Sequence, residues 1–236
     1  MQTENVVGEI QSALKRINAG ENTIIIFTSD NGCSKAAGIK ELAKKGHIVS
    51  ANLRGSKADL WDGGHRIPFI VKWPSKVKAG TESNQLICLT DLFATVSNLL
   101  GEKIPQNSGE DSVSFLPALY GKKIVSTRKG VIHHSISGHF AYRQGPWKLL
   151  LAKASGGWTS PNERQAPASS APGQLYNMST DLGEKKNLYK EKPEMVASLL
   201  ALLEKDIKRG RSTKGPKSKN DLNDIKIWKS GAPKKK

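Results

Sequence analysis

A run of apolar and β-branched residues, TIIIF at positions 23–27, constrains the fold of this chain more than any other feature. A strand that is apolar on both faces is buried on both faces, as in the centre of a parallel or mixed sheet. An apolar stripe at helical spacing over residues 4–18 precedes it, and Ala19-Gly20 ends that helix. Helix, short loop and buried strand form an α/β unit, so we expect an α/β fold.

Further elements follow from local patterns. Residues 68–73 predict a second core strand, and residues 33–56 between the strands predict a long loop with at most a short helix near 36–44. Residues 91–100 predict a helix that Thr90 caps. Its expected buried stripe consists of Leu92, Val96, Leu99 and Leu100.

The pattern changes after residue 120. Short apolar runs at 131–135, 139–143 and 147–151, separated by glycine-containing turns, predict a small antiparallel sheet. A stretch rich in Ser, Gly, Ala and Pro at 153–173 predicts an exposed loop. A terminal helix is predicted over 193–209, stopped by glycine, with an apolar stripe of Val196, Leu199, Leu200, Leu203 and Ile207.

Positive charge is concentrated at the end of the chain. Of a formal net charge of +16, residues 205–236 carry +9, from 12 Lys or Arg against 3 Asp or Glu. Like charges repel, and this segment has few apolar residues, so we expect a basic disordered tail over residues 213–236. Such a tail attracts polyanions without sequence preference. No recognition helix or aromatic platform predicts specific nucleic-acid binding.

The two cysteines, Cys33 and Cys88, form no CxxC motif and predict neither a disulfide framework nor a zinc site. No apolar run is long enough for a transmembrane segment. The first residues contain acids and lack a continuous apolar core, so they do not predict a signal peptide. Together these features leave the cellular compartment undecided.

Asp30 and Asn31 directly follow the first strand. Ligands of open α/β sheets bind at the carboxyl ends of the strands, and a carboxylate beside an amide offers the oxygen ligands that Ca²⁺ or Mg²⁺ prefers. The alternative is that Asp-Asn-Gly is simply a turn. Both interpretations stay open from the local sequence.

Lys57 lies in a glycine-rich loop, where backbone can approach an anion closely and an ammonium can contact phosphate or sulfate oxygens. His65 and Arg66 could support the anion, although Arg66 could instead tie loops together through carboxylates. His47, His133 and His134 are candidate substrate contacts. The alternatives are a solvated lysine and structural histidines.

Five segments resemble the sulfatase family of the alkaline phosphatase superfamily. They are TIIIFTSDNG, RGSKADLWDGGHRIPFIVKWP and LTDLFATVSNLLG, then FAYRQGPWKLLL and QLYNMSTDLGEKKNL with the family's R-x-G-x-W-K-L and LY-x-x-x-x-D-x-x-E-x-x-NL patterns. The resemblance implies that residues 1–122 are the C-terminal portion of the α/β catalytic domain, a mixed sheet sandwiched by helices. Residues 123–212 would be its small antiparallel subdomain with a terminal helix.

The same resemblance implies roles in a site. Asp30 and Asn31 match one pair of calcium ligands, Lys57 matches the lysine that contacts the substrate sulfate, and His65 lies in a GG-H-R form of the loop seen in some subgroups. In the family, a formylglycine made from the cysteine of a C-x-P-x-R motif attacks sulfur while Ca²⁺ neutralises the sulfate oxygens. The implied activity is hydrolysis of the sulfate ester of a small molecule or glycan.

The chain departs from the family in its nucleophile. Neither Cys33 nor Cys88 begins a C-x-P-x-R motif, and the family's first acidic metal ligands belong to an N-terminal half without counterpart here. We therefore expect no catalytic nucleophile, an incomplete calcium site, an exposed sheet edge and a chain that is inactive alone. A truncated frame, a wrong start and a separately encoded N-terminal half all stay open. Family members are commonly periplasmic, extracellular or lysosomal.

Two other functions stay open. A phosphate-ester hydrolase of the same superfamily would use a Ser or Thr nucleophile, although the Lys57 loop and the C-terminal patterns favour sulfate. A basic polyanion-binding remnant would depend on the tail.

Overall fold

The computed structural model describes residues 2–126 and 128–229. The elements in chain order are α1 (Gln2–Arg16), β1 (Ile25–Thr28), η1 (Lys35–Ala37), α2 (Ile39–Lys44), η2 (Asp62–Gly64), β2 (Phe69–Lys72), α3 (Asp91–Leu100), α4 (Leu116–Leu119), β3 (Val131–His134), β4 (Phe140–Gln144), β5 (Trp147–Leu150), β6 (Gln174–Asn177) and α5 (Pro193–Arg209).

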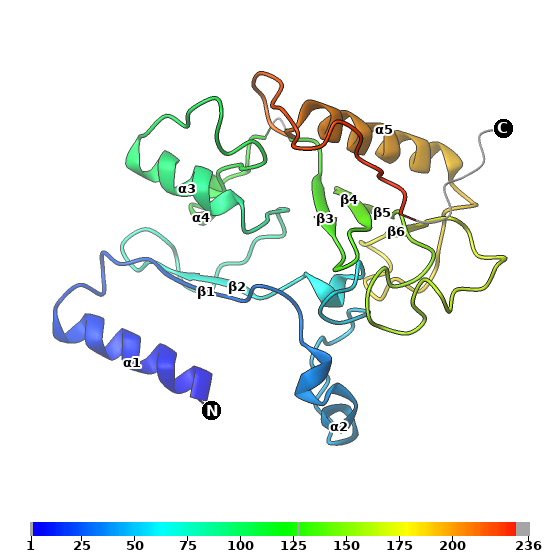
Figure 1. The fold of residues 1–236 in the computed structure, drawn as a ribbon. Helices are drawn as coiled ribbons and strands as arrows, with labels where there is room; N and C mark the ends of the chain where they lie inside the picture. The colour runs from blue at the N-terminus through cyan, green and yellow to red at the C-terminus, as the bar shows by residue number, and fades with distance from the viewer. Residues whose placement is uncertain (1, 127, 230–236) are drawn as a thin grey trace.

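The strands form two separate sheets, a pair β1-β2 and a four-stranded sheet in the order β3-β4-β5-β6 (Figure 1). Every neighbouring pair in both sheets is antiparallel. The small antiparallel sheet and its terminal helix are therefore confirmed, as is the α/β class. The strand β6, which the alternation pattern did not single out, completes the sheet.

Helix α5 covers one face of the four-stranded sheet (Figure 1). Its stripe of Val196, Leu199 and Leu203 is buried, as the helical spacing predicts. Because side chains alternate along a strand, one residue set faces this helix: Phe140, Tyr142, Leu149, Leu151 and Leu175. This cluster is the main core of the described chain.

The opposite face of the same sheet receives the loop of residues 54–66, called here the Lys57 loop. Leu60 and Trp61 of this loop are 0% and 1% exposed. They pack on the alternate strand residues and their neighbours, which are Ala141, Leu150, Ala152, Tyr176 and Met178. A glycine-rich segment without helix or strand over most of its length is thus fixed by an apolar anchor.

The pair β1-β2 corrects an expectation. Ile26 and Ile70 are 37% and 60% exposed, whereas the sequence predicts strands buried on both faces. Ile26 aligns with Val71, so Ile70 lies on the opposite face, and neither face is fully covered. The reason is that this sheet has two strands in the described residues. An apolar strand is buried only where further layers exist to cover it.

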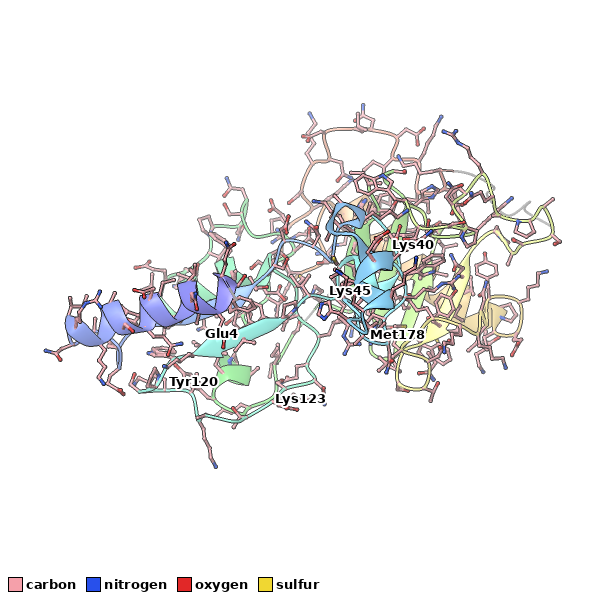
Figure 2. All side chains as sticks on the ribbon, turned by 90° about the horizontal axis from the view of Figure 1, so that it is seen from below. Glu4, Lys40, Lys45, Tyr120, Lys123 and Met178 are labelled. Atoms are coloured by element: carbon pink, nitrogen blue, oxygen red, sulfur yellow. The ribbon has the colours of Figure 1, made fainter. Side chains whose placement is uncertain are left out.

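Helix α1 forms where the periodicity predicts, but no residue of it is buried, and Val6 and Ile10 are exposed. A hydrogen bond from the Nζ of Lys72 to the Oε1 of Gln11 joins it to β2. In Figure 2, Glu4 of α1 and Tyr120 lie on one side of the molecule, and Lys40, Lys45 and Met178 lie on the other.

No helix in residues 2–126 and 128–229 combines the length and apolarity needed to cross a membrane.

Helix α3 has the predicted bounds but a different cap and a different buried face. Thr90 has helical backbone angles and makes no capping bond, whereas the Oδ2 of Asp91 accepts a hydrogen bond from the Cys88 amide at 2.9 Å. Val96 and Leu100 are 49% and 69% exposed. The buried residues are Asp91, Ala94 and Thr95, because the helix is held by hydrogen bonds to residues 112–115.

Two segments expected to be loose are packed in part. In the 153–173 loop, Ala154 and Ser155 are buried, because the Ser155 carbonyl accepts the amide of Leu60 at 2.8 Å. In the tail, Ile225, Ile227 and Trp228 pack against the α5 core. The expectation of a disordered tail over residues 213–236 stays a prediction, and residues 230–236 lie outside the described residues.

Candidate functional site

The Lys57 loop is fixed to the sheet by polar contacts as well as by its apolar anchor. The indole Nε1 of Trp61 donates to the Oε1 of Gln174 at 3.0 Å. The guanidinium of Arg54 lies 3.6 Å from the centroid of the Trp61 ring and donates to the carbonyl of Glu184 at 2.7 Å. These contacts hold the start and the middle of the loop, so the intervening Lys57 starts from a defined backbone.

The Asp30-Asn31 segment is joined directly to this loop. The amide of Gly32 donates to the Gly64 carbonyl, and the amide of Lys57 donates to the Cys33 carbonyl, both at 2.9 Å. A Cβ on Gly32 would lie 1.8 Å from the carbonyl oxygen of Gly63, so only glycine allows this approach. The structure thus brings together the two segments that carry the candidate metal ligands and the candidate anion-binding lysine.

A buried ionic cluster of Asp62, Lys148 and Glu184 lies beneath the loop. The Nζ of Lys148, which is 0% exposed, lies 2.6 Å from the Oδ1 of Asp62 and 2.8 Å from the Oε1 of Glu184. The other oxygen of Glu184 accepts the amide of Asp62 at 2.6 Å. The single buried ammonium gives each carboxylate an ion-pair partner, and low-dielectric surroundings require such pairing.

The two carboxylates of this cluster differ in pKa. Burial alone would raise the pKa of Asp62, but the ammonium of Lys148 and a hydrogen bond with His65 outweigh it and hold this pKa well below its usual range. Burial raises the pKa of Glu184, and the charge of Asp62 adds to that effect against the opposing charge of Lys148. Asp62 is therefore the anionic centre of the cluster.

His65 and His133 lie beside this cluster, with ring centroids 3.9 Å apart and ring planes tilted by 41°. The Nε2 of His65 lies 3.4 Å from both the Oδ1 of Asp62 and the Nζ of Lys148. Burial lowers the pKa of both histidines, that of His133 well below its usual range, and the charge of Lys148 lowers them further. Both rings are therefore neutral at pH 7.

A hollow of about 400 Å³ opens beside Asp30 and Asn31, lined also by Cys33, Ser50 and Arg66. Asp30 is exposed, and its Oδ1 accepts the hydroxyl of Ser29 at 3.4 Å. The donor chemistry fits Ca²⁺, but this ion takes about six to eight oxygens. Within the described part of the chain, no group of three or more His, Cys, Asp or Glu side chains is placed to hold a metal ion. The residues present therefore do not hold the ion by themselves.

The remaining candidates are separate from this arrangement. His47 is exposed near the end of α2, and His134 is exposed with its ring 4.3 Å from that of Phe140. Cys33 and Cys88 are free thiols. Burial raises the pKa of the Cys88 thiol, which is the opposite of what a nucleophile needs. Arg66 lies 3.7 Å from the Oδ2 of Asp62, so it ties the loop and also lines the hollow.

Asp62, Lys148 and Glu184 are site residues that the sequence patterns did not predict. Two of them do stand in the quoted C-terminal patterns, as the lysine of W-K-L and the glutamate of D-x-x-E. Asp59 was missed as well. Its Oδ1 accepts the amides of Trp158 and Thr159 at 2.8 and 3.0 Å. A charged residue that stands among apolar ones in the sequence indicates a buried ion pair, because charged side chains are buried only when they are paired.

The fold and the site together define a class of protein. It is an α/β domain whose acid-amide strand end binds a lysine-bearing glycine loop, with a small antiparallel subdomain packed behind that loop. Residues 1–102 match the family model described as Sulfatase. The chain belongs to the sulfatase family.

Individual relatives agree. N-acetylgalactosamine-6-O-sulfatase of Bacteroides thetaiotaomicron is 35% identical over 213 residues, which are 86% of this chain and 40% of that protein. Arylsulfatase G of Rattus norvegicus is 28% identical over 208 residues, 82% of this chain and 38% of that protein.

Two solved structures have the same fold. One belongs to work on metabolism of multiple glycosaminoglycans by Bacteroides thetaiotaomicron; it has a TM-score of 0.74 at 33% identity, covering 86% of this chain and 42% of that one. The other, Ps i-CgsB in complex with k-i-k-neocarrahexaose, has a TM-score of 0.66 at 25% identity, covering 90% of this chain and 42% of that one.

The chain spans about 40% of the length of the curated relatives it matches over most of its own length. These relatives are named sulfatases, so the alternatives of a phosphate-ester hydrolase and a polyanion-binding remnant are not favoured. A separately encoded N-terminal half finds no support in them and stays a prediction.

Proposed function

We propose that this chain provides one side of a sulfate-ester hydrolase centre. Lys57 contacts the sulfate group of the substrate, and Asp30 and Asn31 supply two of the oxygen ligands of a Ca²⁺ ion. The observation that carries the proposal is the pair of hydrogen bonds from Gly32 to Gly64 and from Lys57 to Cys33, which joins these residues into one surface. No nucleophile is assigned within this chain, because it has no C-x-P-x-R motif.

The chemistry of each residue follows from its surroundings. Lys57 is half-buried, and its Nζ has no hydrogen-bond or ion-pair partner within residues 2–126 and 128–229, so its charge is available to an anion. A bound Ca²⁺ would offset charge on the sulfate oxygens. The ionic cluster beneath the loop holds the lysine backbone in place, which positions the ammonium without the cost of ordering a loose loop.

A sulfated glycan is the substrate class we favour. The relative of 35% identity is named for a 6-O-sulfated N-acetylgalactosamine, and Ps i-CgsB was solved with a neocarrahexaose. Aryl sulfates and other small sulfate esters are the alternatives. The half-buried ring pair of His65 and His133 is close to Lys148 rather than to the hollow, so we assign it a structural part in the cluster and not a sugar contact.

The proposal predicts that the isolated chain binds but does not turn over. We expect no release of sulfate from an aryl sulfate or from N-acetylgalactosamine 6-sulfate with Ca²⁺ present, because the chain has no C-x-P-x-R motif. We expect weak binding of the sulfated sugar, reduced at least tenfold by Lys57→Ala. Lys45→Ala, on the exposed residue after α2, is the matched control. Turnover by the pure chain, or equal binding by both variants, would contradict the proposal.

A further inference from the structure

A second hollow, of about 420 Å³, lies between the loop after α3 and the segment after α5. Its lining includes Gln106, Ser108, Arg211, Lys214 and Gly215. It shares no lining residue with the hollow beside Asp30, and Lys57 is not part of it. We call it the Arg211 hollow. Its volume is in the range of sites that hold small ligands, about 300–1,000 Å³.

Arg211 gives this hollow an unusual electrostatic character. The residue is 5% exposed, and its Nη1 donates to the carbonyls of Gln106 and Pro216, both at 3.0 Å. Its Nε is buried and has no hydrogen-bond partner. No carboxylate forms an ion pair with Arg211 among the described residues. Two neutral carbonyls leave the positive charge itself uncompensated.

Two carboxylates contact residues that follow Arg211 in the chain, but neither forms an ion pair with it. The Oδ1 of Asp111 accepts the amide of Ser212 at 2.8 Å, and the Oε1 of Glu110 lies 3.4 Å from the hydroxyl of Ser218. The contrast with Arg128 is direct. The side chain of Arg128 is 6% exposed, and both oxygens of Asp91 neutralise it at 2.7 and 2.9 Å. Arg211 lacks the carboxylate partner that Arg128 has. A buried charge without a counter-charge is costly, so a bound anion would be stabilising here.

We propose that the Arg211 hollow binds a tetrahedral oxyanion, the sulfate group of a sulfated sugar, as a second anion site separate from the Lys57 loop. The anion supplies the missing counter-charge to Arg211. A guanidinium is well matched to such an anion because its planar N–H groups bond paired oxygens. The choice of a sulfated sugar rests on the proposed function, whereas the anion chemistry does not.

The test is binding of inorganic sulfate, and of a sulfated disaccharide against its desulfated form, to the whole chain. Amide signals of Gly109 and Gly215 in NMR spectra report locally on the hollow. We expect these signals to shift when the ligand is added to the unmodified chain. We expect the affinity for the ligand to fall at least tenfold in Arg211→Gln. Because that variant also loses two structural hydrogen bonds, Ser108→Glu is the second variant. It keeps Arg211 and places a carboxylate in the hollow.

Two controls separate this site from charge effects and from the proposed centre. Ser12→Glu changes the net charge equally on the exposed surface of α1, and it should leave the affinity unchanged. Lys57→Ala should leave the glycine signals unchanged. If the ligand-induced shifts of Gly109 and Gly215 disappeared in Lys57→Ala but remained in Ser108→Glu, the inference would be overturned and the proposed function would stay intact. Absence of any shift, or equal loss in Ser12→Glu, would overturn it as well.

The ligand arms identify the source of the anion. Binding of the sulfated disaccharide that is tighter than that of inorganic sulfate and is lost on desulfation supports a glycan sulfate. If free sulfate shifted the glycine signals and the disaccharide did not bind, the hollow would bind a free oxyanion, and the glycan part of the proposal would be overturned.

Discussion

The Nζ of Lys148 and the Oε1 of Glu184 lie 2.8 Å apart, and neither side chain has any exposed surface. Both residues belong to the antiparallel subdomain, yet the third member of their cluster is Asp62 of the Lys57 loop. The position of the loop is therefore set from the C-terminal part of the chain. The same contacts that complete the charge balance of the subdomain also fix the candidate anion-binding surface.

Replacing Lys148 by methionine should strongly destabilise the chain. Two buried carboxylates would lose their shared counter-charge, and breaking a buried pair in this way costs about 3–5 kcal/mol. The measurement is the free energy of unfolding in urea. Lys186→Met is the matched control, since Lys186 pairs with Glu191 at 3.2 Å on the surface, with 71% and 55% of the side chains exposed. That change should cost less than about 1 kcal/mol, and equal costs would show that the buried cluster is not special.

Stability should fall on mild acidification because of His65 and His133. The fold keeps both rings neutral by lowering their pKa, whereas the unfolded chain takes up protons near pH 6.5. The unfolded state thus binds more protons as pH falls. The stabilising contribution is full above about pH 6.5 and declines below it, by up to about 1.4 kcal/mol per pH unit for each ring.

The measurement is the free energy of unfolding between pH 7.5 and 5.5. Glu184, whose pKa is raised in the fold, contributes a slope of the opposite sign, so the contribution of the histidines is taken from the difference between each variant and the unmodified chain. His133→Gln should flatten the slope, and His47→Gln, on an exposed side chain, should not. An unchanged slope in His133→Gln would contradict the assignment of a neutral buried ring.

The contact between Gly32 and Gly63 should not tolerate a side chain. In Gly32→Ala the new Cβ would lie 1.8 Å from a carbonyl oxygen, so backbone must move, at a cost of about 1–3 kcal/mol. We expect weaker binding of the sulfated sugar as well, since the displacement separates Asn31 from the Lys57 loop. Gly8→Ala, with nothing within 4 Å, should be neutral or slightly stabilising. Unfolding in urea and calorimetry measure the two effects.

The tail should contribute to stability through Trp228. This residue packs against the α5 core, so Trp228→Ala should lower the free energy of unfolding by about 1–3 kcal/mol. Leu222, at 67% exposure, is the control, and Leu222→Ala should change it by less than about 0.5 kcal/mol. Equal effects would return the tail to the disorder that its composition predicts.

Local signals predicted the elements well. The helical spacing of apolar residues and the residues that start and stop helices placed α3 at residues 91–100 and α5 at residues 193–209. These signals depend only on neighbouring residues. What they could not give was the partner of each face. Val96 was expected inside and is exposed, because burial depends on segments distant in sequence such as residues 112–115.

The sequence predicted the candidate site residues better than it predicted the buried cluster that holds them in place. Asp30, Asn31 and Lys57 stood out because their chemistry is readable beside a strand end and in a glycine loop. The cluster that fixes the loop was not, since Lys148 resembles any lysine of an exposed strand until its two carboxylates are located. Tail composition did not indicate the packing of Trp228 against the α5 core, because composition averages over residues and a single aromatic side chain can make such a contact.

The cluster of Asp62 and Glu184 has a consequence for biosynthesis. The two residues are 122 positions apart in the chain, so the Lys57 loop leaves the ribosome long before the glutamate that holds it. During that interval the carboxylate that accepts the amide of Asp62 is still absent. We therefore expect the Lys57 loop to become ordered only after Glu184 has been synthesised.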